Sequence, residues 1–209
     1  PKPRPEVPQR GIKRVSFASA KAKVPYLVMG FKVPVLLQAV AGEDVEEWEI
    51  YALDVLAETL DGDDSARFNR NLVRGREVAT QISAGFSSAA RLTSLFFCSA
   101  VPREGTSLAE LEKAILDEIE ALKTEPPSAG ELERIKTQVI ADTVFERDSM
   151  QHQAMIIGSL RAVGLDWRLK DTYVDAIKAV TREQVRAVAE KYLKRSVLTV
   201  ANLVPEDAS

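Results

Sequence analysis

The sequence of 209 residues predicts an α+β fold in which helices cover one face of a largely antiparallel sheet. Strand patterns occur as neighbouring pairs, which favours antiparallel hairpins. Helical patterns occur in blocks, which favours a separate helical layer packed on one side of the sheet. The expected order of elements is β-β-α-α-β-β-α-α-α-α-β, with no internal repeat.

The first nine residues carry four prolines among charged residues, a composition typical of an extended linker. We therefore expect a linker arm over residues 1–10, a single domain over residues 11–205 and a short tail over residues 206–209. Because the sequence starts with proline rather than methionine, we expect the chain to be an excised piece or a processed product.

Two strands and a helix are expected after the arm. Residues 11–20 form the first strand, with Val15 and Phe17 on one side. Residues 26–33 are apolar almost throughout, which is typical of a central strand covered on at least one face. Asp44 can then cap a helix. This helix has a broad apolar face made of Trp48, Tyr51, Leu53, Val55 and Leu56.

Residues 60–86 read as a helix end, an acidic glycine turn, a short helix and a strand. Asp64 or Ser65 can cap the short helix, which ends at Gly75. Residues 78–86 then alternate in polarity as strands do, and residues 92–101 can pair with them as a hairpin. The aspartates around Gly62 could bind calcium, but they lack the alternation and closing glutamate of an EF-hand loop. A capped turn is therefore the favoured interpretation.

The second half is mostly helical, and three capping boxes mark helix starts. These boxes begin at Ser107, Ser128 and Thr181. The helix after Ser128 is expected to be long, reaching Val163 or Gly164 with a bend near Met150. Asp166 can cap one more helix, and residues 197–204 form the last strand.

Composition and charge exclude several classes of function. The net charge of −3, from 28 basic and 31 acidic residues, gives no reason to expect a nucleic-acid partner. No apolar run approaches the roughly 20 residues that span a bilayer. Cys98 is the single cysteine and lies in an apolar run, so we expect a buried structural thiol.

Catalytic chemistry within this chain is not expected. His152 is the single histidine, and a catalytic zinc site needs three protein ligands, which the remaining carboxylates do not offer at a suitable spacing. No G-x-S-x-G elbow accompanies His152. Asp142, Glu146 and Asp148 share one helix side, where a solvated face is favoured over a paired acid–base site. We therefore expect neither catalytic residues nor metal ligands.

Several segments nevertheless resemble, in order and spacing, the pitrilysin and mitochondrial-processing-peptidase superfamily of zinc peptidases. The family has a helix with the pattern S-R-L-x-x-x-L-R and a strand with G-L-A-Y. The similar text here is Ser65-Ala66-Arg67-Phe68, Asn71-Leu72-Val73-Arg74 and Glu77-Val78-Ala79-Thr80. Further similar segments lie at residues 25–34, 51–56, 131–136 and 180–185. The resemblance covers residues 8–205 and implies the second, non-metal-binding half of such a peptidase, with one sheet layer covered by helices.

The resemblance also implies a function. Such a half packs against a homologous half that carries H-x-x-E-H, encloses a chamber and positions an extended peptide for metal-assisted hydrolysis. Zinc is expected in that partner half, in the same polypeptide or a partner subunit, and this chain alone is expected to be inactive. Self-association is expected because separation leaves apolar surface exposed. Exported bacterial relatives suggest the periplasm. A non-proteolytic scaffold subunit and a free-standing binding domain are the alternatives.

The family's second half commonly supplies an arginine and, seven residues later, a tyrosine, which contact the substrate near the scissile carbonyl. Without gaps, these positions fall on Val73 and Thr80. Arg74 and Gln81 keep the same spacing one residue later, and Arg76 lies close. The candidate substrate-binding residues are therefore Arg74, Arg76, Thr80 and Gln81. The alternative is a surface arginine and a strand residue with no part in catalysis.

Overall fold

The computed structural model describes residues 9–146 and 148–206, and their strands form one five-stranded sheet in the order β1-β5-β2-β4-β3. The strands are β1 (Lys13–Ser19), β2 (Tyr26–Val33), β3 (Ala79–Gly85), β4 (Ser94–Pro102) and β5 (Leu198–Pro205). Among these strands β1 and β5 pair in parallel, and the other neighbours pair antiparallel. The predicted hairpin of β3 with β4 and the central position of β2 are both confirmed.

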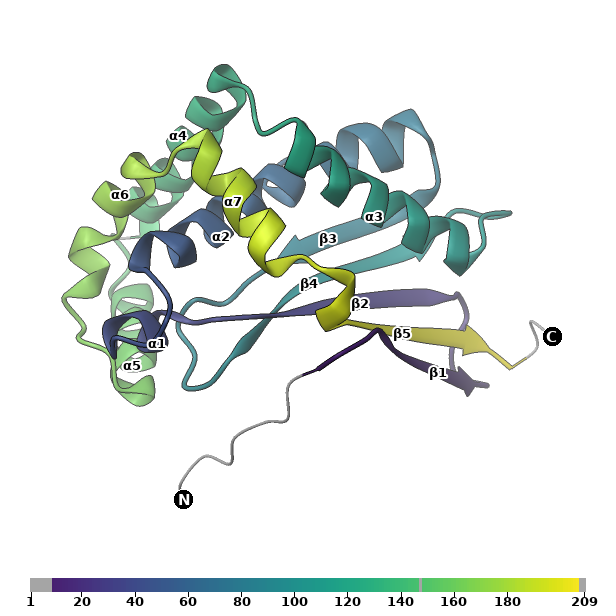
Figure 1. The fold of residues 1–209 in the computed structure, drawn as a ribbon, viewed down its shortest axis with the longest axis horizontal. Coiled ribbons are helices and arrows are strands. Elements are labelled where there is room, and N and C mark those ends of the chain that lie inside the picture. The colour runs from purple at the N-terminus through teal and green to yellow at the C-terminus, as the bar shows by residue number, and fades with distance from the viewer. Residues whose placement is uncertain (1–8, 147, 207–209) are drawn as a thin grey trace.

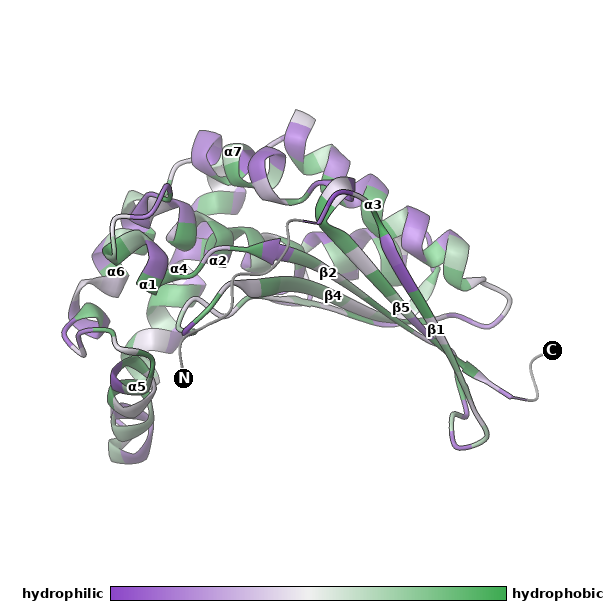
Figure 2. Cartoon of the chain, turned by 60° about the horizontal axis from the view of Figure 1, so that its bottom comes forward, coloured by the Kyte–Doolittle hydropathy of each residue, from purple (hydrophilic) through white to green (hydrophobic). Residues whose placement is uncertain are grey.

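The helices lie on one face of this sheet (Figure 1). They are α1 (Leu36–Val40), α2 (Glu47–Asp61), α3 (Leu108–Thr124), α4 (Ala129–Glu146), α5 (Met150–Val163), α6 (Leu169–Ala179) and α7 (Arg182–Tyr192), with a π-helix η1 (Asn69–Gly75) and a 3-10 turn η2 (Arg195–Val197). Three of them, α2, α3 and α7, lie over the sheet, whereas α4, α5 and α6 gather at one end. Figure 2 shows no described helix beneath the sheet, and α5 projects past its end. The predicted α+β fold is confirmed.

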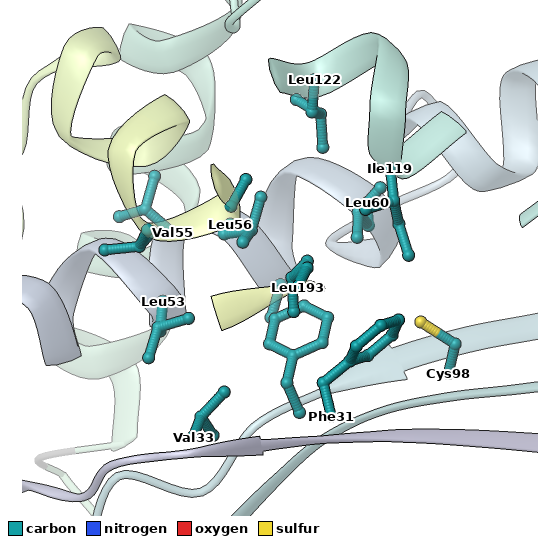
Figure 3. Close-up of a cluster of buried hydrophobic side chains, with 14 of the residues drawn as sticks. Phe31, Val33, Leu53, Val55, Leu56, Leu60, Cys98, Ile119, Leu122 and Leu193 are labelled. Carbon is teal, nitrogen blue, oxygen red and sulfur yellow. The ribbon is translucent and has the colours of Figure 1, made fainter. Parts of the chain in front are cut away.

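The core lies between the sheet and this helical layer, because alternate strand residues point toward the helices. On β2 these residues are Leu27, Met29, Phe31 and Val33, all essentially inaccessible to solvent. Figure 3 shows Phe31 beneath Leu193, with Leu53, Leu56 and Leu60 of α2 and Ile119 and Leu122 of α3 closing the cluster from above. Cys98 of β4 joins this cluster, and burial raises the pKa of its thiol. The expected buried thiol is confirmed.

On the opposite face, two glycines lie beneath large side chains. A Cβ on Gly85 would come within 2.6 Å of the Phe97 ring, and one on Gly30 would come within 3.3 Å of Leu95. Gly85 and Phe97 are paired across β3 and β4. The aromatic ring therefore lies over its glycine partner on the neighbouring strand, which needs the space that a missing side chain leaves.

The long helix predicted after Ser128 is instead two helices, α4 and α5. The Ser149 hydroxyl accepts a hydrogen bond from the His152 backbone at 3.2 Å, so Ser149 caps a new helix. A bend near Met150 was expected, but local capping chemistry starts a separate helix there. The predicted end at Gly164 is confirmed, since Gly164 adopts a left-handed φ of 95°.

The predicted N-caps of α2 and of the short helix before β3 are wrong. The helix α2 is capped at Glu46 rather than Asp44, because the Glu49 carboxylate accepts from the Glu46 backbone at 3.1 Å. Neither Asp64 nor Ser65 caps the short helix, because Asp63 accepts from both the backbone and the hydroxyl of Ser65 at 2.7 Å. The three capping boxes at Ser107, Ser128 and Thr181 are confirmed.

Three further local features differ from the expected pattern. The helix α1 follows Val35 in a stretch for which no element is predicted, and the short helix before β3 is π-helical rather than α-helical. Asp166 accepts from the Arg168 backbone at 3.0 Å, but α6 begins after Arg168. Most of the expected arm and tail, residues 1–8 and 207–209, lies outside the described residues. Gln9 donates to the Leu198 carbonyl at 2.7 Å, which ties the arm's end to β5.

Candidate substrate-binding face

The sheet face opposite the helices, here called the open face, carries exposed apolar side chains. They are Val15 and Phe17 of β1, Tyr26 of β2, and Leu95 and Phe97 of β4. Each alternates along its strand with a residue that points the other way, as the pleat of a strand requires. Large apolar side chains that remain exposed on one sheet face are typical of an interaction site rather than of a solvated sheet.

A polar pocket of about 390 Å³ lies on the open face near the β3 edge of the sheet. Its lining includes Tyr26, Asn69, Thr80, Gln81, Ser83 and Ser99. The hydroxyls of Ser83 and Ser99 are 2.7 Å apart, and Thr80 Oγ1 donates to the Val101 carbonyl at 3.4 Å. Hydroxyl and amide groups therefore converge on this pocket, and they can donate to and accept from a peptide backbone.

A β-bulge explains why Thr80 and Gln81 both reach this pocket. Ala79 lies opposite Pro102 and Gln81 lies opposite Val101, which leaves Thr80 as an extra residue on β3. In a regular strand, neighbouring residues point to opposite faces. The bulge breaks this alternation, so both side chains are exposed and line the same pocket.

The structure does not bring Arg74 and Arg76 to this pocket. Arg74 donates to the backbone carbonyl of Asp64, across the turn before η1. Arg76 Nη1 lies 3.8 Å from the Asp117 carboxylate of α3, on the helical side. Val73 is partly buried against the core. Of the four candidate residues, Thr80 and Gln81 therefore lie together, and the two arginines lie apart from them.

Tyr26 is one of the pocket residues that sequence reasoning missed, together with Asn69, Ser83 and Ser99. It opens an almost wholly apolar strand, a pattern that predicts cover on at least one face and does not mark Tyr26 as a binding residue. Its exposed fraction is 37%, whereas the adjacent Leu27 is fully buried. Its phenol hydroxyl could have indicated this position, because a tyrosine on a core strand usually places its hydroxyl group where water or another polar group can bind it.

The described residues contain no group of three or more His, Cys, Asp and Glu side chains that could hold a metal ion. In the acidic turn, the Asp61 carboxylate accepts from the Ala84 backbone at 3.1 Å, and Asp63 pairs with Arg134. Carboxylates engaged in this way act as hydrogen-bond and ion-pair partners within the fold, which favours a structural turn over a calcium site.

A larger pocket of about 610 Å³ lies between α2, α5, α6 and the segment after β3, and it contains none of the candidate residues. His152, Lys170 and Tyr173 are its main polar groups. Beside it, burial and the Glu58 carboxylate raise the pKa of Asp54 to about 8, although Tyr173 donates a hydrogen bond that opposes the rise. Because most other lining side chains are apolar, the pocket is chiefly a packing gap beside α5.

Comparisons with known proteins decide the family. A model described as the peptidase M16 inactive domain matches residues 1–139. The chain belongs to the M16 peptidase family. This finding confirms the resemblance to pitrilysin-type zinc peptidases and identifies the chain as an inactive domain. No curated protein matches it significantly. No described helix is both long and apolar enough to span a bilayer.

Solved structures agree with this M16 assignment at the level of the fold. A Helicobacter pylori protease is 22% identical with a TM-score of 0.86, and the match covers 98% of this chain and 47% of that one. An inactive peptidase domain from Bordetella parapertussis is 20% identical with a TM-score of 0.75, covering 90% and 94%. A peptidase M16 inactive domain structure from Pseudomonas fluorescens is 18% identical with a TM-score of 0.72, covering 97% and 45%. The M16 domain thus spans about half of the first and third structures.

Proposed function

We propose that this M16 domain is the non-catalytic half of a zinc metalloendopeptidase. In this proposal its open face turns toward a homologous half that carries H-x-x-E-H and zinc, and the two halves enclose an extended peptide. Zinc held by the partner half would supply the activated water for hydrolysis. This domain contributes shape and backbone-binding groups, and it is inactive alone.

The observation that carries the proposal is the combination of apolar and polar groups on the open face. Leu95 and Phe97 are exposed on β4, and an apolar surface of this kind favours burial against another protein. The polar pocket lies on the same face near the β3 edge. A partner that covers the apolar part would leave the pocket facing the space between the halves.

In the proposed complex, Tyr26, Thr80 and Gln81 hold the peptide backbone. The phenol and threonine hydroxyls and the glutamine amide can donate to peptide carbonyl oxygens. A donor close to the scissile carbonyl would also stabilise the developing oxyanion. Tyr26 would thus supply, from a different strand, the phenol that the family places where this chain has Thr80. Arg74 and Arg76 would join only after releasing their present partners.

Reconstitution tests this proposal. The purified chain is mixed with its H-x-x-E-H half, and cleavage of a fluorogenic peptide is measured. We expect the mixture to cleave and neither half to do so alone. Tyr26→Phe and Thr80→Ala should lower kcat/KM about 10-fold or more without loss of association. Thr172→Ala on exposed α6 serves as the matched control. Failure of the halves to associate or to complement each other would refute the proposal.

A non-proteolytic scaffold subunit is the second candidate, and two observations favour it. Val73 and Thr80 occupy the positions of the family's arginine and tyrosine, and Arg74 is engaged with the Asp64 carbonyl. The two functions are distinguished by the neighbouring sequence. An H-x-x-E-H motif in the intact polypeptide or a co-expressed partner supports the peptidase, and its absence from both supports the scaffold.

A further inference from the structure

The outer edge of β1 has no described neighbour, and we propose that it is a homodimerisation edge. In this proposal two copies of the chain pair their β1 strands antiparallel about Ser16, which joins the two five-stranded sheets into one continuous sheet. The inference concerns the sheet edge rather than the peptide pocket, so it does not depend on the proposed function.

The exposure of β1 is the first observation. This strand pairs with β5 along one side only, and six of its seven residues are exposed. Val15 is 58% exposed and Phe17 is 65% exposed, although both types favour strand interiors. An unprotected edge strand presents a row of free N–H and C=O groups, which favours pairing with another strand. Within β1 there is no proline or bulge to prevent this.

The order of side chains along β1 makes the edge self-complementary. With Ser16 opposite its own copy, Val15 lies opposite Phe17 of the second copy, and this pair occurs twice on the open face. Pairs of aromatic and β-branched side chains are among the favourable cross-strand pairs, and directly opposed like charges are unfavourable. Here Lys13 lies opposite Ser19 and Arg14 lies opposite Ala18, so no like charges meet.

Arg14 would not hinder the pairing, because its charge is already engaged within its own chain. Its guanidinium makes two hydrogen bonds to Glu112 of α3, at 2.6 and 2.7 Å. This contact holds the arginine side chain against the helical side and away from the edge. The remaining charge on β1 is Lys13 at its start, where the two copies are farthest from the symmetry axis.

The other edge of the sheet is closed to the same kind of pairing. On β3, the Asp61 carboxylate accepts from the Ala84 backbone at 3.1 Å, so a side chain already occupies part of that edge. At its start, the Val78 backbone donates to the Leu72 carbonyl at 2.9 Å. The sheet is therefore extended more readily at β1, and the partner that fits its register is a second copy.

A disulfide experiment tests the register directly. In Ser16→Cys, the new thiol lies opposite its own copy, and mild oxidation should give a covalent dimer. Lys13→Cys is the matched control, because its counterpart across the axis is Ser19, and it should give no covalent dimer. A mixture of Lys13→Cys with Ser19→Cys should cross-link. Cys98 is buried and does not compete. Equal cross-linking of Ser16→Cys and Lys13→Cys would overturn the proposal.

Sedimentation of the full chain gives the second test. One contact of seven residues is small for a stable interface, so the unmodified chain should form a weak dimer whose fraction rises with protein concentration. The double variants Val15→Lys/Phe17→Lys and Val15→Glu/Phe17→Glu should each be monomeric, and an equimolar mixture should dimerise, because lysine then faces glutamate. Leu95→Lys on β4 should leave the dimer intact. Dimer loss in Leu95→Lys, or no dimer of the unmodified chain at any concentration, would refute pairing through β1.

Discussion

Replacing Asp54 with asparagine is expected to stabilise this M16 domain at neutral and alkaline pH. Asp54 lies on α2 and is half-buried. Burial is the main cause that raises the pKa of its carboxyl group from the ordinary 3.8 to about 8, and the Glu58 charge adds to the rise. Tyr173 donates a hydrogen bond that opposes it. Asparagine keeps a hydrogen-bonding oxygen but removes the charge.

The sign and size of the effect follow from proton binding. Between pH 3.8 and about 8 the folded state binds more protons at Asp54 than the unfolded state does, so the free energy of unfolding falls as pH rises through this window. The contribution of Asp54 protonation to the free energy of unfolding is fully present below pH 3.8 and lost above about pH 8. The full shift would correspond to roughly 6 kcal/mol at about 1.4 kcal/mol per tenfold change in proton affinity. Since Asp54 is partly solvated, we expect about half of this.

Urea unfolding at pH 5, 7 and 9 checks the prediction. Asp54→Asn should exceed the unmodified domain in free energy of unfolding by an amount that grows with pH, reaching about 3 kcal/mol at pH 9. Asp175→Asn, on exposed α6, is the matched control and should change stability by less than about 0.5 kcal/mol. If the Asp54→Asn difference stays constant across these pH values, Asp54 is not the group that titrates.

Three further predictions concern buried side chains, an ion pair and a close contact on the sheet. Phe31→Ala should cost about 3–5 kcal/mol in urea unfolding, because Phe31 is fully buried in the core; a loss below about 1 kcal/mol would contradict this. Arg67→Met should cost about 2–4 kcal/mol at neutral pH, since it leaves the Glu131 carboxylate, now paired at 3.0 and 3.1 Å, without its cation. Adding Glu131→Gln should recover part of that loss. If the free-energy changes of the two single variants simply add, Arg67 and Glu131 do not stabilise each other. Gly85→Ala should lower the melting temperature because the new methyl meets the Phe97 ring, and Phe97→Ala should relieve the effect, whereas an unchanged melting temperature would show that the ring moves freely.

Much of the fold could be predicted because local chemistry decides it. Alternating or continuous apolar runs located all five strands, and the capping boxes at Ser107, Ser128 and Thr181 each start a helix. Cys98 was placed correctly from its apolar neighbours. In these cases the residues within a few positions supply both the hydrogen bonds and the hydrophobic periodicity, so no distant contact is needed to interpret them.

What could not be predicted depends on contacts far along the chain. The helix α2 begins after Glu46 because the Glu49 carboxylate accepts from the Glu46 backbone while it also pairs with Lys191 of α7 at 2.7 Å. The contact with Lys191 lies far along the chain, so the residues around Asp44 do not reveal it. The bulge at Thr80 is visible only against its partner strand, so the sequence could not place Thr80 and Gln81 on one face. Tyr26 was missed for the same reason, since its pocket is built from three strands.

The parallel pairing of β1 with β5 has a consequence for how the domain is completed. The first strand of the domain adjoins the last, with β5 inserted between β1 and the central β2. Synthesis proceeds from the N-terminus, so one side of β1 and one side of β2 stay unpaired until residues 198–205 have been synthesised. Such closure across nearly the whole sequence is slow, and a nascent or clipped molecule lacking residues 198–205 would be prone to exchanging strands with its neighbours.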